Sequence, residues 1–397
     1  MNLKIYTDTV DDLARKQISR LLEQPAFAEA KVRIMPDVHA GKGCVIGFTA
    51  DLGDKVIPNI VGVDIGCGML TVNLGKKKPD FAELDSIMHR NIPSGMYVHG
   101  EVVEAFDEID ALQCLPQLKK VNRLLCSLGT LGGGNHFVEV DVDSKGNYYL
   151  IIHSGSRNLG KQVCDVYQSM AVDVHAGRAN INDIITELKA QGRFTEIQPT
   201  INALNQTQPS IPAELCYLEG EQRAYYLHDM RICQQFALRN REVMADIIVR
   251  RLGLDVEDMF HTTHNYIDHE SNIVRKGAIS ARAGEKLLIP INMRDGCIFG
   301  TGKGNEDWNQ SAPHGAGRIM SRSQAFKQLS VDEFRKQMEG IYTTSVNART
   351  LDESPMVYKG LDDILQHIGP TVDVADIFKP LYNFKAEEAE PSFKRKK

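Results

Sequence analysis

The sequence lacks the features that mark several large protein classes. Its eight cysteines lie at least 12 positions apart, so none are paired at zinc-ribbon spacing. No apolar run approaches the roughly 18 residues that span a membrane, and residues 1–8 lack the apolar stretch of a secretory signal. Basic side chains do not predominate, since 46 Lys and Arg stand against 52 Asp and Glu. We therefore expect a cytoplasmic protein with reduced thiols and no membrane contact, although net charge does not exclude a local basic groove.

The 397 residues have an ordinary globular composition, with 42% hydrophobic and 25% charged side chains. Helical and strand-like patterns are mixed along the chain, which favours the α+β class. We expect a single large domain over residues 1–385, with mixed β-sheets at its core surrounded by helices, and a charged C-terminal tail over 386–397. Helices are expected at 10–22, 159–175, 221–251 and 316–329, strands at 31–35, 45–49, 69–74, 137–142 and 148–153, and a surface excursion at 190–212.

Two glycine-rich segments carry side chains that bind metals. In the first, GVDIGCGM at residues 62–69, the glycines allow a tight turn that brings Asp64 and Cys67 to one point. In the second, GTLGGGNHFVE at residues 129–139, a triple glycine precedes His136 and permits close approach to a phosphate, without the pattern of a P-loop. Each segment also has a plainer interpretation, which is a buried free cysteine for the first and a flexible loop for the second.

Three further histidines, His153, His264 and His314, stand at the ends of predicted strands beside small or polar residues. A single histidine is more often a hydrogen-bonded structural side chain than a ligand. Three of them together with Asp64 and Cys67 indicate a transition-metal site.

Three other side chains have a context that fits more than one role. His39, in the string MPDVH, forms with Asp37 either a second pair of metal ligands or a support for the site. Arg157 and Arg318 each lie four residues after a histidine, next to glycine turns, where an arginine suits bidentate binding of phosphate. The alternative for each arginine is an ordinary surface salt bridge.

Short strings that occur in family order over nearly the whole chain make the sequence resemble the RtcB family of RNA ligases. Taken together, these strings are far more specific than any one motif. They are MPDVH (35–39), GVDIGCGM (62–69), GTLGGGNHF (129–137), HSGSR (153–157), HN (264–265), RKGA (275–278), GKGN (302–305), HGAGR (314–318) and YK (358–359).

The resemblance implies an enzyme that joins an RNA end bearing a 3′-phosphate or 2′,3′-cyclic phosphate to a 5′-hydroxyl end, in RNA repair or tRNA splicing. It implies GTP and two Mn²⁺ ions as cofactors, and RNA with broken ends as the partner. Cys67 would bridge the two ions. Asp64 and His264 would complete one ion, and His136 and His153 the other. His314 would be the catalytic nucleophile that becomes covalently guanylylated.

The resemblance also implies a GMP pocket and contacts to RNA phosphate. Residues at this pocket would be Asn135, His136, Phe137, Val138, Glu139, His264, Asn265, Pro290, Ile291, Asn292, Met293, Cys297, His314, Gly315, Ala316, Gly317 and Lys385. The side chains expected to contact RNA phosphate are Arg157, Lys276 and Arg318.

The sequence departs from the family pattern around the nucleotide and not at the metal ligands. Ile291 and Asn292 replace the glycine and serine of the family string PGSM. Cys297 stands where the family has a serine, and Ala386 replaces the glycine of the family string VKG. These four differences bear on nucleotide selectivity.

Two other functions compete with ligation. The first is a dinuclear metal phosphoesterase that opens RNA cyclic phosphates without ligation, and the presence of His314 and of the GMP pocket argues against it. The second is a non-catalytic RNA-binding protein, and the complete set of metal-binding side chains argues against that. Imidazole and carboxylate suit Mn²⁺, whereas the Cys67 thiolate favours Zn²⁺ or copper, so selectivity for Mn²⁺ needs a further cause.

Overall fold

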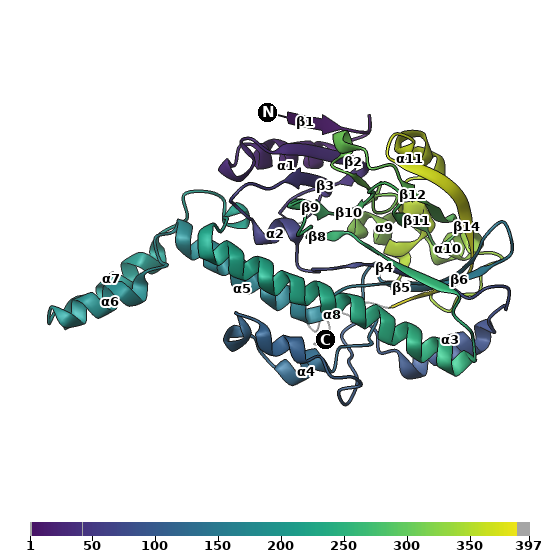
Figure 1. Cartoon of the computed structure of the whole chain (residues 1–397), viewed down its shortest axis with the longest axis horizontal. Coiled ribbons are helices and arrows are strands. Elements are labelled where there is room, and N and C mark those ends of the chain that lie inside the picture. The colour runs from purple at the N-terminus through teal and green to yellow at the C-terminus, as the bar shows by residue number, and fades with distance from the viewer. Residues whose placement is uncertain (1, 42, 387–397) are drawn as a thin grey trace.

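The computed structural model describes residues 2–41 and 43–386 (Figure 1). Its strands are β1 (Asn2–Ile5), β2 (Lys31–His39), β3 (Ile46–Asp51), β4 (Gly68–Asn73), β5 (Phe137–Val142), β6 (Tyr148–Ser154), β7 (Asp258–Thr263), β8 (Asn265–Ile267), β9 (Ile273–Lys276), β10 (Ala278–Ser280), β11 (Lys286–Asn292), β12 (Gly296–Gly302), β13 (Ser311–Pro313) and β14 (Val372–Lys385). Its α-helices are α1 (Asp12–Leu22), α2 (Pro58–Val61), α3 (Phe81–Asn91), α4 (Val121–Leu125), α5 (Arg157–His175), α6 (Ile181–Ala190), α7 (Phe194–Gln206), α8 (Gly220–Leu252), α9 (Arg322–Gln328), α10 (Val331–Gln337) and α11 (Leu361–Ile368).

Two large sheets lie at the centre of the described chain. The larger has seven strands in the order β11-β12-β14-β5-β6-β4-β7, and all neighbours are antiparallel. The other has five strands in the order β1-β2-β3-β9-β8, and only β1 and β2 are parallel. A short antiparallel pair joins β10 to β13. Helices surround these sheets, which confirms the expected α+β class and the mixed sheets at the core (Figure 1).

The long helix α8 connects the cores of the two large sheets. It has 33 residues and packs against β6, β4 and α5 (Figure 1). Tyr226 and Phe236 are buried in the core cluster that contains side chains of the five-stranded sheet. Met244 and Ile248 are buried in the cluster that contains side chains of the seven-stranded sheet. The helix ends at Gly253, whose φ of +58° is the left-handed conformation that glycine adopts without strain.

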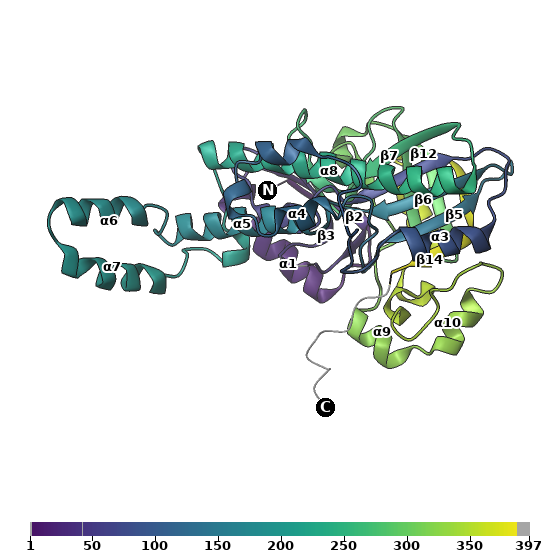
Figure 2. The same ribbon diagram turned by 90° about the horizontal axis from the view of Figure 1, so that it is seen from below.

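A helical hairpin formed by α6 and α7 projects away from the body of the protein (Figures 1 and 2). The expected surface excursion over 190–212 is therefore in the right place, but most of it is helix. Pro199 lies inside α7 and removes a backbone donor there, so sequence propensity argues against this helix. Packing of α6 against α7 offsets that cost.

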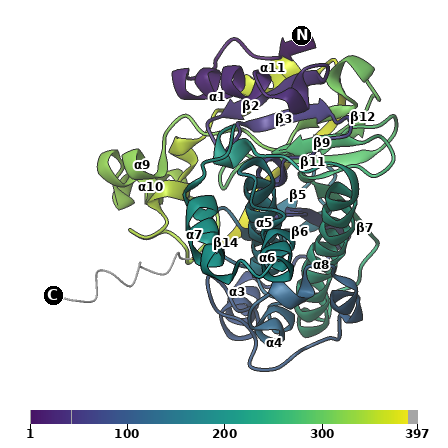
Figure 3. The same ribbon diagram turned by 90° about the vertical axis from the view of Figure 1, so that its left-hand side faces the viewer.

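The segment that contains α9 and α10 forms a small lobe beside β14 (Figures 2 and 3). The expected helix over 316–329 is wrong in its first part, because α9 begins only at Arg322 and Ser321 is its N-cap. Gly317 explains the delay, since its φ is +76° and a Cβ there would lie 2.2 Å from the carbonyl oxygen of Asp37. Close contact with β2 therefore holds residues before Ser321 out of the helix.

The last described residue, Ala386, is buried beyond the end of β14. The rest of the expected tail, residues 387–397, lies outside the described residues, so the division into 1–385 and 386–397 stays a prediction. No helix in residues 2–41 and 43–386 has both the length and the apolar character to cross a membrane.

We expect the α6–α7 hairpin to be dispensable for folding. None of its side chains belongs to a core cluster, and its two ends meet where the Ser210 amide donates to the His175 carbonyl at 3.3 Å. Replacing residues 177–209 with a short Gly-Ser linker should shift the melting temperature by no more than a few degrees. Thermal unfolding followed by circular dichroism measures this. Loss of the cooperative transition would contradict the prediction.

Candidate metal centre and nucleotide cavity

Four neighbouring strands of the seven-stranded sheet bring metal-binding side chains to one edge. The order β5-β6-β4-β7 is antiparallel, so the starts of β5 and β4 lie beside the ends of β6 and β7. Cys67 directly precedes β4, and His136 directly precedes β5. His153 lies near the end of β6, and His264 directly follows β7. The register thus gathers residues that are far apart in the sequence.

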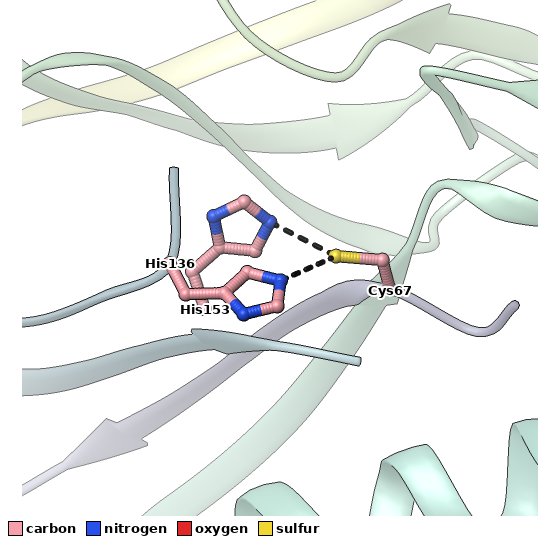
Figure 4. Close-up of side chains that lie close together, drawn as sticks. All are labelled: Cys67, His136 and His153. Atoms are coloured by element: carbon pink, nitrogen blue, oxygen red, sulfur yellow. Dashed lines mark hydrogen bonds between the residues drawn. The ribbon is translucent and has the colours of Figure 1, made fainter. Parts of the chain in front are cut away.

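The side chains at this edge are in contact (Figure 4). Cys67 Sγ lies 3.4 Å from His136 Nε2 and 3.3 Å from His153 Nε2. His153 Nε2 is 3.4 Å from His264 Nε2. His136 Nε2 is 2.9 Å from Asp64 Oδ2. All five side chains that the sequence predicts as metal ligands are therefore in one cluster.

Backbone carbonyls orient the two histidines next to Cys67. His136 Nδ1 lies 2.9 Å from the carbonyl oxygen of Leu131, and His153 Nδ1 lies 3.2 Å from that of Asn135. A carbonyl only accepts, so each Nδ1 carries a hydrogen and each Nε2 is directed at the thiol.

The buried groups in this cluster fit a metal ion better than they fit one another. Asp64 Oδ1 is buried without a hydrogen-bond partner, and the two Nε2 atoms of His153 and His264 face each other. Burial lowers the pKa of both histidines well below the ordinary value, so both rings are neutral, as metal ligands must be. Although burial acts to raise it, the hydrogen bond and charge of His136 bring the pKa of Asp64 down to about 2. One oxygen, three imidazole nitrogens and one sulfur form a donor set for a transition metal.

The Cys67 thiol is the donor most dependent on a bound cation. Burial raises its pKa well above the ordinary value, and the negative charge of Asp64 raises it further. A metal ion in contact with the sulfur acts in the opposite direction and favours the thiolate.

Asp37 holds His314, which settles the two roles left open for the MPDVH string. The Asp37 side chain is fully buried, and its Oδ2 lies 2.6 Å from His314 Nδ1 and 3.2 Å from the His314 amide nitrogen. A carboxylate only accepts, so His314 Nδ1 carries the hydrogen and Nε2 carries the lone pair. Its ring centroid lies 4.8 Å from that of His264. Asp37 is therefore a support for His314, while His39 hydrogen-bonds through Nδ1 to the Asp37 carbonyl.

A cavity of about 1120 Å³ opens beside the metal-binding cluster and His314. It is large enough for a nucleotide. The predicted site residues that line it are Asp64, Cys67, Asn135, Phe137, Glu139, His153, His264, Asn265, Pro290, Ile291, Asn292, Met293, His314, Gly315, Ala316, Gly317, Arg318 and Lys385.

Three predicted pocket residues lie outside this lining. His136 contacts Asp64 and Cys67 from behind. Val138 is fully buried in the core, because alternation along β5 turns it to the face opposite Phe137. Cys297 is also fully buried, and it contacts the cavity only through Glu139.

The three side chains predicted to contact RNA phosphate have different surroundings. Arg318 lines the cavity, and its guanidinium contacts Glu353 Oε1 at 3.3 Å. Arg157 donates to Thr130 Oγ1 and to the Gly95 carbonyl, outside the cavity lining. Lys276 is buried, and its ammonium donates to the Asn59 carbonyl at 2.9 Å.

Glu353 is a functional candidate that sequence patterns do not reveal. Its buried carboxylate lies 3.1 Å from Lys385 Nζ and 2.6 Å from the Tyr358 hydroxyl, and it also pairs with Arg318 and Arg322. Although burial acts to raise it, Lys385 and the two arginines bring the pKa of Glu353 down to about 2. The YK string pointed to Tyr358 without a role, but no motif pointed to Glu353 in its short 3₁₀ turn.

A family model described as "tRNA-splicing ligase RtcB" matches residues 17–115 and 110–386 of the chain. The RNA-splicing ligase RtcB of Escherichia coli (strain K12) is 30% identical over 403 residues, which cover 91% of this chain and 91% of that protein. The tRNA-splicing ligase RtcB of Aeropyrum pernix is 27% identical over 425 residues, covering 84% and 83%. That of Thermococcus kodakarensis is 26% identical over 461 residues, covering 91% and 90%.

A sheet edge with sulfur, nitrogen and oxygen donors beside a histidine–aspartate pair defines a metal-dependent enzyme as the class of protein. The family match extends over nearly all of the sheets and helices that build this edge. The chain belongs to the RtcB family, and the resemblance seen in the sequence strings is confirmed.

We expect Gly155→Ala to weaken Mn²⁺ binding by roughly 10- to 100-fold, the range for groups that orient metal ligands. A Cβ at Gly155 would lie 2.1 Å from Asp64 Oδ1, so Asp64 must move away from the cluster. Gly53→Ala is the matched control, since a Cβ there meets nothing within 4 Å. Titration calorimetry with Mn²⁺ measures both affinities. Equal affinities would show that Asp64 does not bind the metal.

Proposed function

We propose that this protein is a GTP- and Mn²⁺-dependent RNA ligase that joins RNA 3′-phosphate or 2′,3′-cyclic phosphate ends to 5′-hydroxyl ends. The observation that carries this proposal is the position of His314, whose Nε2 lone pair is set by Asp37 in the cavity that the metal-binding cluster also lines. The printed names of the relatives, RNA-splicing and tRNA-splicing ligases, support a role in RNA repair or tRNA splicing.

The metal-binding cluster suits two Mn²⁺ ions in the proposed function. Asp64, Cys67 and His264 would hold one ion, and Cys67, His136 and His153 would hold the other. Bound ions supply positive charge that offsets the negative charge of the phosphates. The imidazole and carboxylate donors suit Mn²⁺, and the buried thiol is the donor that departs from that preference.

His314 is proposed as the nucleophile. Its Nε2 attacks the α-phosphorus of GTP, so that a P–N bond forms and pyrophosphate leaves. An oxygen of the RNA 3′-phosphate then takes the GMP from His314, and the RNA 5′-hydroxyl oxygen finally displaces GMP as the phosphodiester forms. Asp37 keeps Nδ1 protonated and stabilises the positive charge that develops on the ring.

The guanine base is proposed to lie near Glu139, Phe137 and Lys385. A carboxylate accepts hydrogen bonds from N1–H and the exocyclic amine of guanine, and adenine lacks that arrangement of donors. Lys385 lies next to Phe137 across the β14–β5 pair, with its ammonium 5.2 Å from the Phe137 ring centroid. Of the three side chains expected to contact RNA phosphate, the proposal keeps Arg318, which lines the cavity.

Replacing His314 with alanine should abolish labelling of the protein by GTP but leave sealing of RNA that already carries a 3′-diphosphoguanosine end. The reason is that His314 forms a covalent bond only in the first step. Cys67→Ala should lose both activities, because the thiolate contacts both ions. Each variant is incubated with Mn²⁺ and either α-phosphate-labelled GTP or pre-activated RNA, with His367→Ala as the control.

Labelling of the His314→Ala variant, or normal sealing by the Cys67→Ala variant, would contradict these role assignments. Opening of a cyclic phosphate by the unsubstituted protein without any labelling or joining would instead favour the dinuclear phosphoesterase.

Asp37→Asn should slow guanylylation by on the order of 100- to 10,000-fold, because an amide N–H facing Nδ1 favours the wrong tautomer of His314. Sealing of pre-activated RNA should change little, because that step does not use His314 as a nucleophile. Single-turnover labelling with GTP gives the rate. An unchanged rate would show that Asp37 does not set the protonation of His314.

A further inference from the structure

Two carboxyl groups and a thiol are buried together behind the wall of the cavity. Glu139 and Asp141 are two positions apart on β5, so they point to the same face of the sheet, and Cys297 comes from β12. Their ligand atoms all lie within 4.8 Å of one another. Glu139 is 2% exposed, and the other two are 0% exposed. Among these three only Glu139 lines the cavity, so Asp141 and Cys297 act on a bound nucleotide through Glu139.

Glu139 has hydrogen-bond partners, and Asp141 has none. Asn383 donates its side-chain N–H to Glu139 Oε2, and Cys297 Sγ lies 3.8 Å from Glu139 Oε1. Neither carboxyl oxygen of Asp141 has a hydrogen-bond partner within the part of the chain that the structure describes. Its neighbour across the β14 pair is Pro380, which has no backbone N–H to offer.

The charges around Asp141 favour its neutral form. Burial raises the pKa of Asp141 well above the ordinary value, and the negative charge of Glu139 raises it further. Burial also raises the pKa of Glu139, but Asn383 and the positive charge of Lys385 act in the opposite direction on that group. The proton that two adjacent buried carboxyl groups must keep therefore belongs on Asp141.

The remaining titratable groups on this face do not change that assignment. On β12, burial raises the pKa of the Cys297 thiol well above the ordinary value, so it stays neutral. On β6, Tyr149 lies opposite Asp141, but its hydroxyl hydrogen-bonds to Asp143. On β14, Lys385 pairs with Glu353 at 3.1 Å.

We propose that Asp141 is a positioning residue, a neutral carboxylic acid whose O–H donates to the Glu139 carboxylate and holds that carboxylate ionised and facing the base of the nucleotide. This inference rests on the proposed function, in which Glu139 reads guanine. An ionised Glu139 accepts from the two guanine donors, whereas a protonated Glu139 would present a hydroxyl to them. Asp141 thereby sets nucleotide selectivity without touching the nucleotide.

The test compares two substitutions that differ in one property. Asp141→Asn keeps a neutral side chain that can donate an N–H to Glu139, while Asp141→Leu has a similar size and no donor. Asp373→Asn is the control, since the Asp373 side chain is 69% exposed. For each variant the KM for GTP in protein labelling, the labelling with ATP and the sealing of pre-activated RNA are measured in Mn²⁺.

Asp141→Asn should keep the KM for GTP within about threefold of wild type. Asp141→Leu should raise it by roughly 10- to 100-fold, the value of one hydrogen bond to a charged group. Sealing of pre-activated RNA should be unchanged in both, which a general folding defect would not allow. A loss of GTP affinity in Asp141→Asn equal to that in Asp141→Leu would overturn the proposal, because it would require an anionic Asp141, as a metal ligand would be.

A second measurement separates failure of this inference from failure of the proposed function. The infrared spectrum of the full chain should contain the C=O band of a protonated, buried carboxylic acid, and the band should disappear in Asp141→Asn. Absence of the band in wild type would overturn the proposal whatever the enzyme does. Presence of the band with no GTP labelling in wild type would leave Asp141 protonated and would refute the ligase function instead.

Discussion

The antiparallel register of β5, β6, β4 and β7 is the constraint on which the site depends. One face of these strands carries Leu70, Val138 and Ile152 into a hydrophobic core. The opposite face carries Glu139 and His153 toward the cavity. A shift of one residue in any pair would exchange the two faces, because side chains alternate along a strand. Burial of the apolar face therefore fixes the direction of the side chains that bind metal and nucleotide.

The wall of the cavity also depends on buried charge that is paired. Lys385 and Arg318 reach the lining from β14 and from the loop after His314, and Glu353 contacts both. Removing one partner from such a buried pair leaves an uncompensated charge, which costs far more than an exposed pair contributes. Glu353 thus couples the end of the last strand to the loop that holds His314, so the two halves of the nucleotide cavity keep one relative position.

Sequence patterns predicted the strands and the metal ligands better than the rest of the site. The alternation of valine and isoleucine in 137–142 and 148–153 gives β5 and β6 with almost the same bounds. A motif fixes residue types but not the direction of a side chain, which is why Lys276 was expected at phosphate and is buried against Asn59 instead. Glu353 could not be found at all, because its partners come together only when the chain is folded.

The departure at Cys297 shows why the nucleotide pocket varies separately from the metal centre. A thiol is a weaker hydrogen-bond donor than the hydroxyl of the family serine, so Cys297 holds Glu139 less firmly. Asn383 on β14 and Asp141 on β5 provide the other groups around that carboxylate. None of these side chains contacts Cys67 or another predicted metal ligand, which are held by strand ends and backbone carbonyls. Substitutions that change the partners of Glu139 therefore alter which base is bound while the metal-binding donors keep their geometry.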